Sequence, residues 1–377
     1  MPLCICRRGL VLGSVSMFGV SLAWPALAAP AHAEMLEALR AQHALDPYLM
    51  ETLVPIAAEL GSRMGLGGVT VNAVPPAGGV MVCVLRPAAE RGRLPSGVPA
   101  ADESSPVTDP ENRIIAIDSN FLRILVARIA LDSPRNMGGA GAGPYVAVAE
   151  TLLTPPPAHP ELWGPSSPVL RQPTLTSMVR GAVAFVIAHE LGHIVLGRPP
   201  PPSQRDDLTG RARQLAPMCP SLTDPAVVAR RRYEEQADAL AFEAVVAGGP
   251  ALGRSAAGVA GDLGIPLLFL LVLAADIVEI ATVTQNRLSR AMLKMQIGDD
   301  AMRRLLEANE ARQAPGTELV GRFYSATHPA AAQRLLTLRN KLAETPGSIW
   351  YRQPDQGSYR MMLALAETAC AEATGRH

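Results

Sequence analysis

Two histidines and a glutamate lie within five residues of one another in a long apolar segment, residues 176–197, with the sequence TSMVRGAVAFVIAHELGHIVLG. His189, Glu190 and His193 form the pattern H-E-x-x-H. Residues four apart lie on the same face of an α-helix, so both imidazoles can reach one metal ion. Glu190 is not needed as a ligand, and it stands where it could take a proton from a water that the metal activates.

The alternative is that the pattern is accidental or purely structural. A chain with seven His produces this five-residue pattern by chance in roughly one sequence in a hundred. The flanking residues are apolar almost all round, which predicts a helix buried in the core. Two His and one Glu inside such a helix are costly unless they are paired or bound to a metal, so the setting favours a metal site.

A second acidic pattern follows in a segment that predicts a helix from about residue 224 to 246. Glu234 and Asp238 are four apart and share a helix face, whereas Glu235 is turned about a quarter of a circle away. A third zinc ligand and an acid that orients a ligand His would need such a shared face. A solvated, charged helix face is the alternative, and the incomplete ligand set at residues 189–193 favours the metal reading.

The N-terminus has the pattern of a secretory signal peptide. Residues 1–33 contain a basic start ending at Arg7 and Arg8, an apolar stretch, and small-residue cleavage sites ending at Ala28 and Ala33. The apolar stretch is short and contains Gly and Ser, so we favour its removal over retention as an anchor helix. A weak twin-arginine pattern leaves two export routes open, of which we favour the ordinary secretory one. We expect an exported protein, periplasmic or secreted.

The composition is that of a globular chain, with 48% hydrophobic and 18% charged residues. Removing residues 1–33 takes away two Arg and no acid, which changes the formal net charge from zero to −2. This balance does not favour a nucleic-acid partner. Cys83, Cys219 and Cys370 would remain, which allows one disulfide of undetermined pairing, and no C-x-x-C spacing indicates a cysteine zinc site.

The first half of the chain mixes helical and β-type patterns. Residues 34–60 predict a helix that breaks at Gly61. Two short β-type runs in residues 68–85, joined by the sequence PPAGG, predict a hairpin, and residues 86–112 predict a surface loop. Residues 113–118, RIIAID, predict a strand that leads into a helix ending near residue 131.

The segments on either side of the two motif helices differ in character. Residues 132–174 are rich in Gly and Pro and predict a long loop, for which we expect a lid role over the cleft. Residues 264–284 predict a buried helix whose uninterrupted apolar core is too short to cross a bilayer comfortably, with peripheral membrane contact as the alternative. Residues 285–314 and 358–373 predict two further helices.

A third motif, Thr327-His328-Pro329 with Arg334 downstream, completes an ordered set after HELGH at 189–193 and E-x-x-A-D at 234–238. The ordered triple resembles the zinc metalloendopeptidases of the HtpX and CAAX prenyl protease type, which belong to the gluzincins. The resemblance implies one zinc ion per chain, bound by His189, His193 and Glu234, with Glu190 as general base and Asp238 orienting a ligand. It also implies that His328 and Arg334 lie near the cleft and hold substrate or stabilise the oxyanion.

The chain departs from that family in three respects. It has no convincing membrane span after its signal peptide, whereas integral members carry several. Asn72-Ala73 and Gly78-Gly79 are similar to the family's substrate-binding edge strand but lie far upstream of His189, so residues 113–118 are the other candidate for that strand. Residues 132–174 look like an insertion.

These patterns together predict a mostly helical α+β fold. The resemblance implies a zincin-like metalloprotease core with a small β-sheet beside the H-E-x-x-H helix. We expect a signal peptide at 1–33, an N-terminal helix and hairpin region at 34–112, a catalytic domain at 113–345 and a C-terminal helical extension at 346–377.

The expected function is zinc-dependent hydrolysis of peptide bonds in proteins, in envelope protein quality control, with a protein or peptide substrate. The alternative is an exported, metal-binding, protease-like chaperone or adaptor whose hydrolysis is latent or absent. The sequence does not determine the oligomeric state.

Overall fold

A computed structural model describes residues 42–44, 47–92, 94, 101, 106–132, 143–153, 173–199, 225–246, 264–272, 274, 275, 278, 287–312, 331–346, 348 and 352. The elements in chain order are α2 (Pro47–Arg63), β1 (Val69–Val71), β2 (Val80–Leu85), η1 (Ala88–Glu90), β3 (Val107–Asp109), β4 (Ile114–Asp118), α3 (Ser119–Asp132), α4 (Gly143–Leu153), α6 (Pro173–Leu196), α8 (Pro225–Val246), α10 (Arg287–Arg312) and α11 (Ala331–Glu344). These elements confirm a mostly helical α+β fold with a small mixed sheet.

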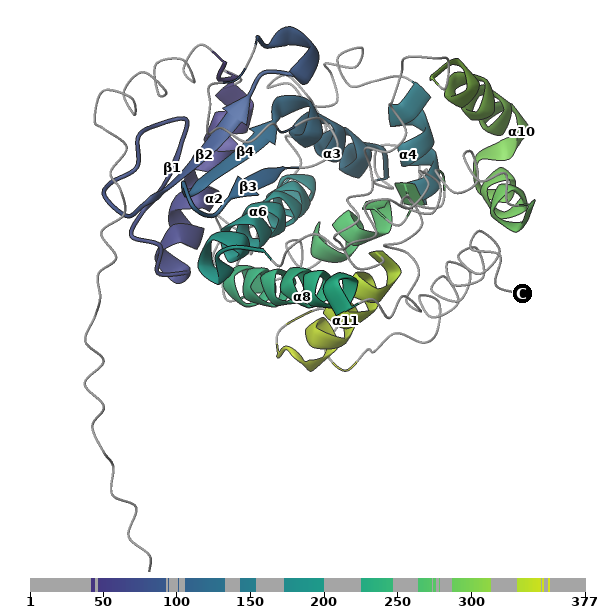
Figure 1. Cartoon of the computed structure of the whole chain (residues 1–377). Helices are drawn as coiled ribbons and strands as arrows, with labels where there is room; N and C mark the ends of the chain where they lie inside the picture. Colours follow the sequence, from purple (N-terminus) through teal and green to yellow (C-terminus); the bar gives the residue numbers. More distant parts are fainter. Residues whose placement is uncertain are drawn as a thin grey trace, which may run out of the picture.

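The sheet has four strands in the order β1-β2-β4-β3. β1 and β4 both pair with β2 in parallel, and β3 pairs with β4 in the antiparallel direction. All six residues of β2 are buried, as expected for a strand that is paired on both sides and covered on both faces. β3 is the edge strand on the side of α6 (Figure 1).

The predicted hairpin in residues 68–85 is wrong, because β1 and β2 are parallel. Val69 pairs with Val80 and Val71 with Val82, so the chain returns to the start of β1 before β2 begins. The return passes close to β1: the Val80 amide donates to the Gly68 carbonyl over 2.9 Å. A Cβ at Gly79 would lie 2.7 Å from that same carbonyl oxygen. Glycine therefore permits an eight-residue return path that the sequence pattern alone does not distinguish from a hairpin.

Side chains of β2 alternate between two apolar layers. Val80, Val82 and Val84 belong to the main core, which also contains buried residues of α2, α3 and α6. Met81, Cys83 and Leu85 face the other side of the sheet, where a smaller cluster includes Ala101. The helices therefore pack on one face of the sheet, and Leu94 and Ala101, which follow β2 in the chain, pack on the other.

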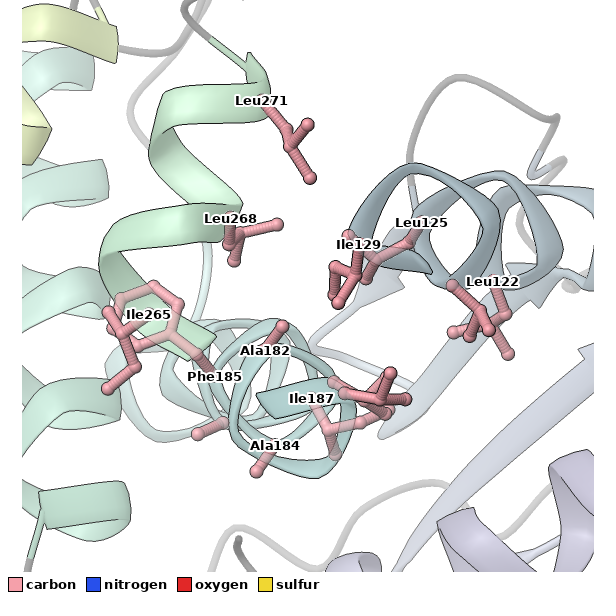
Figure 2. Packing of buried hydrophobic residues seen from close by; sticks show 14 of the residues in the cluster. Leu122, Leu125, Ile129, Ala182, Ala184, Phe185, Ile187, Ile265, Leu268 and Leu271 are labelled. Carbon is pink, nitrogen blue, oxygen red and sulfur yellow. The ribbon is translucent and has the colours of Figure 1, made fainter. Parts of the chain in front are cut away.

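The helix at residues 264–272 packs across α6 at very short range. A Cβ at Gly264 would lie 2.3 Å from the Met178 carbonyl oxygen. Leu268 and Leu271 point toward Leu125 and Ile129 of α3, as Figure 2 shows. The described residues of this segment confirm the predicted buried helix.

Two predicted loops contain regular structure. Residues 86–112 include η1 and the edge strand β3, which pairs with β4 through three residue pairs. Residues 132–174 include α4, which packs against α3 and α10. Ala147, Val148 and Ala149 of α4 are buried, and the Arg128 Nε donates to the Thr151 hydroxyl over 2.9 Å. Residues 143–153 are therefore a helix anchored in the core and not a loop. The rest of the segment up to residue 172 lies outside the described residues, and the lid role stays a prediction.

The other helix predictions agree with the structure where it describes them, except that the helix predicted for residues 34–60 does not include residues 42–44. His43 forms an isolated β-bridge with Leu85, and α2 begins at Pro47. α3, α6 and α8 lie within a few residues of the expected bounds, and α10 has a kink at Gly298. α2 continues through Gly61 to Arg63, so Gly61 is not a helix end. A Cβ at Gly61 would lie 2.5 Å from Val69 Cγ2, which shows that this glycine permits close packing of α2 on β1. The predicted signal peptide, the predicted helix at 358–373 and His328 lie outside the described residues.

One described helix is long and apolar enough to cross a membrane, namely α6 over Leu175–Leu196, but 83% of its most apolar window is buried inside the protein. Cys83 is a free thiol in the buried strand β2, and burial raises its pKa to about 12. Cys219 and Cys370 lie outside the described residues.

Candidate metal centre

The two motif helices, α6 and α8, pack side by side (Figure 1). Gly192 allows this approach, because a Cβ there would lie 3.1 Å from the Cα of Ala237 on α8. The contact brings Glu234 opposite the two histidines. Gly192, which lies inside the H-E-x-x-H motif, thus sets the distance between the two helices that carry the candidate ligands.

His189, His193 and Glu234 form a compact triangle of potential ligand atoms. The two Nε2 atoms are 3.1 Å apart, and the Glu234 Oε2 lies 3.2 Å from His189 Nε2 and 3.4 Å from His193 Nε2. Ligands about 2.0–2.1 Å from a tetrahedral zinc ion are roughly 3.3 Å from one another. All three residues are buried and could hold one metal ion, so the donor set and its spacing fit zinc.

Asp238 fixes the orientation of the first histidine. His189 Nδ1 lies 2.9 Å from Asp238 Oδ1. Since a carboxylate can only accept, Nδ1 carries a proton, which leaves Nε2 as the nitrogen that can bind a metal once its own proton is displaced. The predicted role of Asp238 as an acid that orients a ligand agrees with this contact.

Arg334 of α11 holds Asp238 in turn. Its Nε and Nη2 donate to the two carboxylate oxygens over 2.7 Å and 2.5 Å, and its guanidinium lies 4.8 Å from the centre of the Phe269 ring. Burial alone would raise the pKa of Asp238, but Arg334 and His189 hold it well below its usual range. In this geometry Arg334 contacts Asp238, and its expected role in holding substrate or stabilising an oxyanion stays a prediction.

The electrostatics of the metal-free triangle centre on His189. Burial lowers the pKa of His189, but its hydrogen bonds to Asp238 and Glu234 outweigh this effect and raise the pKa to about 10. The metal-free protein therefore holds a proton among these groups at neutral pH. A metal ion must displace that proton to bind, as is usual for His and carboxylate ligands.

Glu190 is buried and held by the edge strand of the sheet. Its Oε2 accepts a hydrogen bond of 2.5 Å from the hydroxyl of Thr108 on β3. Thr108 is absent from the sequence prediction because residues 86–112 predict a loop. The only local pattern that could predict this strand is the alternation of Val107, Thr108 and Asp109 before a turn. Three residues are too few to identify a strand.

Tyr233 is a second residue that the motifs did not identify. Its ring stacks on His193 with a centroid distance of 4.8 Å and an interplanar angle of 15°. Its hydroxyl donates to the carbonyl oxygen of Gly197 over 2.7 Å and lies 3.5 Å from that of His193. Tyr233 thus contacts both the side chain of a candidate ligand and the last turn of its helix.

Glu235 lies apart from the triangle. It is exposed and lines a cavity of about 290 Å³ between α8 and α11, together with Asp238, Arg334 and Lys341. This placement agrees with the expectation that Glu234 and Asp238 share a face from which Glu235 is turned away.

Comparison of the chain with protein-family models, curated proteins and solved structures finds no match. Functional assignment therefore rests on the residues and their geometry.

Proposed function

We propose that the chain is a zinc-dependent metalloendopeptidase with a zincin-like catalytic core, similar to the HtpX and CAAX prenyl protease type. The observation that carries the proposal is the position of Glu190. It is a buried carboxylate, adjacent in sequence to a ligand and held by Thr108, beside three residues that fit one zinc ion. A purely structural zinc site has four protein ligands and no use for such a base, whereas catalytic sites have three and leave one position open.

The chain's own residues have separable tasks in this reaction. His189, His193 and Glu234 would hold the metal, which supplies a Lewis acid and lowers the pKa of a water to about 7 when bound. Glu190 takes the proton from the attacking water and passes it to the leaving amine. Thr108 occupies Oε2 of Glu190, so Oε1 is the oxygen that exchanges the proton.

The neighbouring edge strand supports an extended protein substrate. β3 is the last strand of the sheet and contacts α6, so its outer edge offers backbone groups to a peptide beside Glu190. Arg198, just beyond α6, also forms an ion pair with Glu111 in the β3–β4 turn. This exposed pair contributes little to stability, but it links the β3–β4 turn to the residues that follow α6.

The export of the protein, and with it a role on envelope proteins, remains part of the proposal. It is supported by the signal-peptide pattern of residues 1–33. The chaperone or adaptor alternative gains no specific support from the described residues, because such a protein has no need of a base held like Glu190.

Cleavage of an unfolded protein by the purified mature chain tests the proposal. Zinc-loaded wild type should cleave the substrate, and Glu190→Gln should reduce the rate by at least about a hundredfold, as expected for loss of a general base. The variant should retain zinc, since Glu190 is not a ligand. Equal rates for wild type and Glu190→Gln at equal zinc content would refute a hydrolytic function.

A further inference from the structure

The two candidate histidine ligands are supported in different ways. His189 has a carboxylate on Nδ1, the arrangement that usually fixes a metal-binding imidazole. His193 is 8% exposed, and its Nδ1 has no hydrogen-bond partner within the part of the chain that the structure describes. A ligand that lacks this second hydrogen bond needs another contact to hold the plane of its ring.

The structure assigns that task to Tyr233. The nearly parallel rings, 15° apart at a centroid distance of 4.8 Å, restrict rotation of the His193 imidazole about its bond to Cβ. With the ring plane fixed, His193 Nε2 stays directed at His189 Nε2 and Glu234 Oε2.

The hydroxyl of Tyr233 acts on the backbone of the same turn. Its hydroxyl donates to the carbonyl oxygen of Gly197, the residue that follows the last turn of α6. Because it points at α6 carbonyl groups, Tyr233 is a positioning residue for His193 and not a donor to substrate.

The ring and the hydroxyl can be separated by substitution. Tyr233→Phe keeps the stacked ring and removes only the hydroxyl. Tyr233→Leu removes the ring and the hydroxyl together, and Tyr233→Met does the same with a more flexible side chain. Tyr145→Leu is a matched control, because Tyr145 is a partly buried tyrosine of α4 that packs on the main core.

The inference rests on the metal centre of the proposed function. The test is the zinc affinity of each variant, measured by competition with a chromophoric chelator. Tyr233→Leu and Tyr233→Met should raise the zinc Kd roughly 10–100-fold, the usual effect of losing an outer contact to a ligand. Tyr233→Phe and Tyr145→Leu should bind zinc close to wild type. The visible spectrum of the Co²⁺-substituted protein should change in Tyr233→Leu and be preserved in Tyr233→Phe.

Wild-type zinc affinity in folded Tyr233→Leu or Tyr233→Met would overturn the inference. Equal losses in Tyr233→Phe and Tyr233→Leu would also overturn it, because the hydroxyl and not the ring would then be responsible. Circular dichroism of the metal-free variants identifies any that fail to fold. If Tyr233→Leu does not fold, Tyr233→Met provides the same test. Zinc binding without cleavage would refute the proposed hydrolysis and leave the assignment of Tyr233 intact, so the two failures are distinguishable.

Discussion

Glu190 is a buried acid, and Thr108 provides the contact that makes its position tolerable. A buried carboxylate without a hydrogen bond is costly, and the short bond from the Thr108 hydroxyl both offsets that cost and fixes the rotamer of the side chain. The same bond joins the candidate base to β3, the strand that would carry the substrate. At the residue scale, Thr108 is therefore the contact most open to a direct test.

We predict that Thr108→Val lowers kcat about 10-fold while KM changes little, because the substitution keeps the β-branched shape and removes the hydroxyl. A misplaced catalytic group costs rate even when binding is unchanged. Thr108→Ser should restore most of kcat, since serine keeps the donor. Steady-state kinetics on a fluorogenic peptide measure both quantities. If Thr108→Ser lowers kcat as much as Thr108→Val does, the Thr108 hydroxyl is not what supports the rate.

Helical spacing in the sequence predicts the candidate ligands and Asp238. It does not predict Thr108 or Tyr233, which contact the centre through the tertiary fold. The i, i+4 rule places His189 with His193 and Glu234 with Asp238, and the structure brings the first three into one triangle. Thr108 is 82 positions from Glu190 in the chain, and no local pattern indicates such a contact. Tyr233 is adjacent to Glu234, but a tyrosine that precedes an acidic residue is not a motif that predicts a role at a metal site.

At the scale of elements, close packing of α6 against its neighbours depends on glycine. Gly192 faces α8, and Gly264 of the 264–272 helix faces the backbone of α6 near Met178. Sequence periodicity predicts these helices but does not predict how closely they approach. The parallel pairing of β1 with β2 was missed for a related reason, since the close passage of Gly79 over Gly68 is a tertiary contact.

We predict that Gly264→Ala destabilises the protein by about 1–3 kcal/mol, the usual cost of overpacking a core. The new Cβ would lie 2.3 Å from a backbone oxygen of α6, and the backbone cannot move aside as a flexible side chain can. Urea unfolding of the zinc-free protein measures the effect. Gly92→Ala is the control and should stay within about 0.5 kcal/mol, because its nearest neighbour would be 3.7 Å away. Equal stabilities of the two variants would contradict the described crossing.

At the scale of the whole molecule, the centre joins four elements that are distant in the chain. β3 holds Glu190, α6 and α8 supply the candidate ligands, and α11 holds Asp238 through Arg334. The main core beneath them packs α2, α3 and α6 on one face of the sheet. Composition and periodicity predict the helical α+β class and the positions of most helices, while the meeting of these four elements requires the folded chain.

The central claim is that one zinc ion is bound by His189, His193 and Glu234. The most direct test is the zinc content per chain of two variants that each remove one carboxylate from adjacent positions of α8. Glu234 is buried with its Oε2 facing both histidines, whereas Glu235 is exposed and lines the cavity between α8 and α11. We predict close to one zinc per chain in wild type and Glu235→Ala, and a large loss in Glu234→Ala. Retention of zinc by Glu234→Ala with its loss from Glu235→Ala would contradict the account.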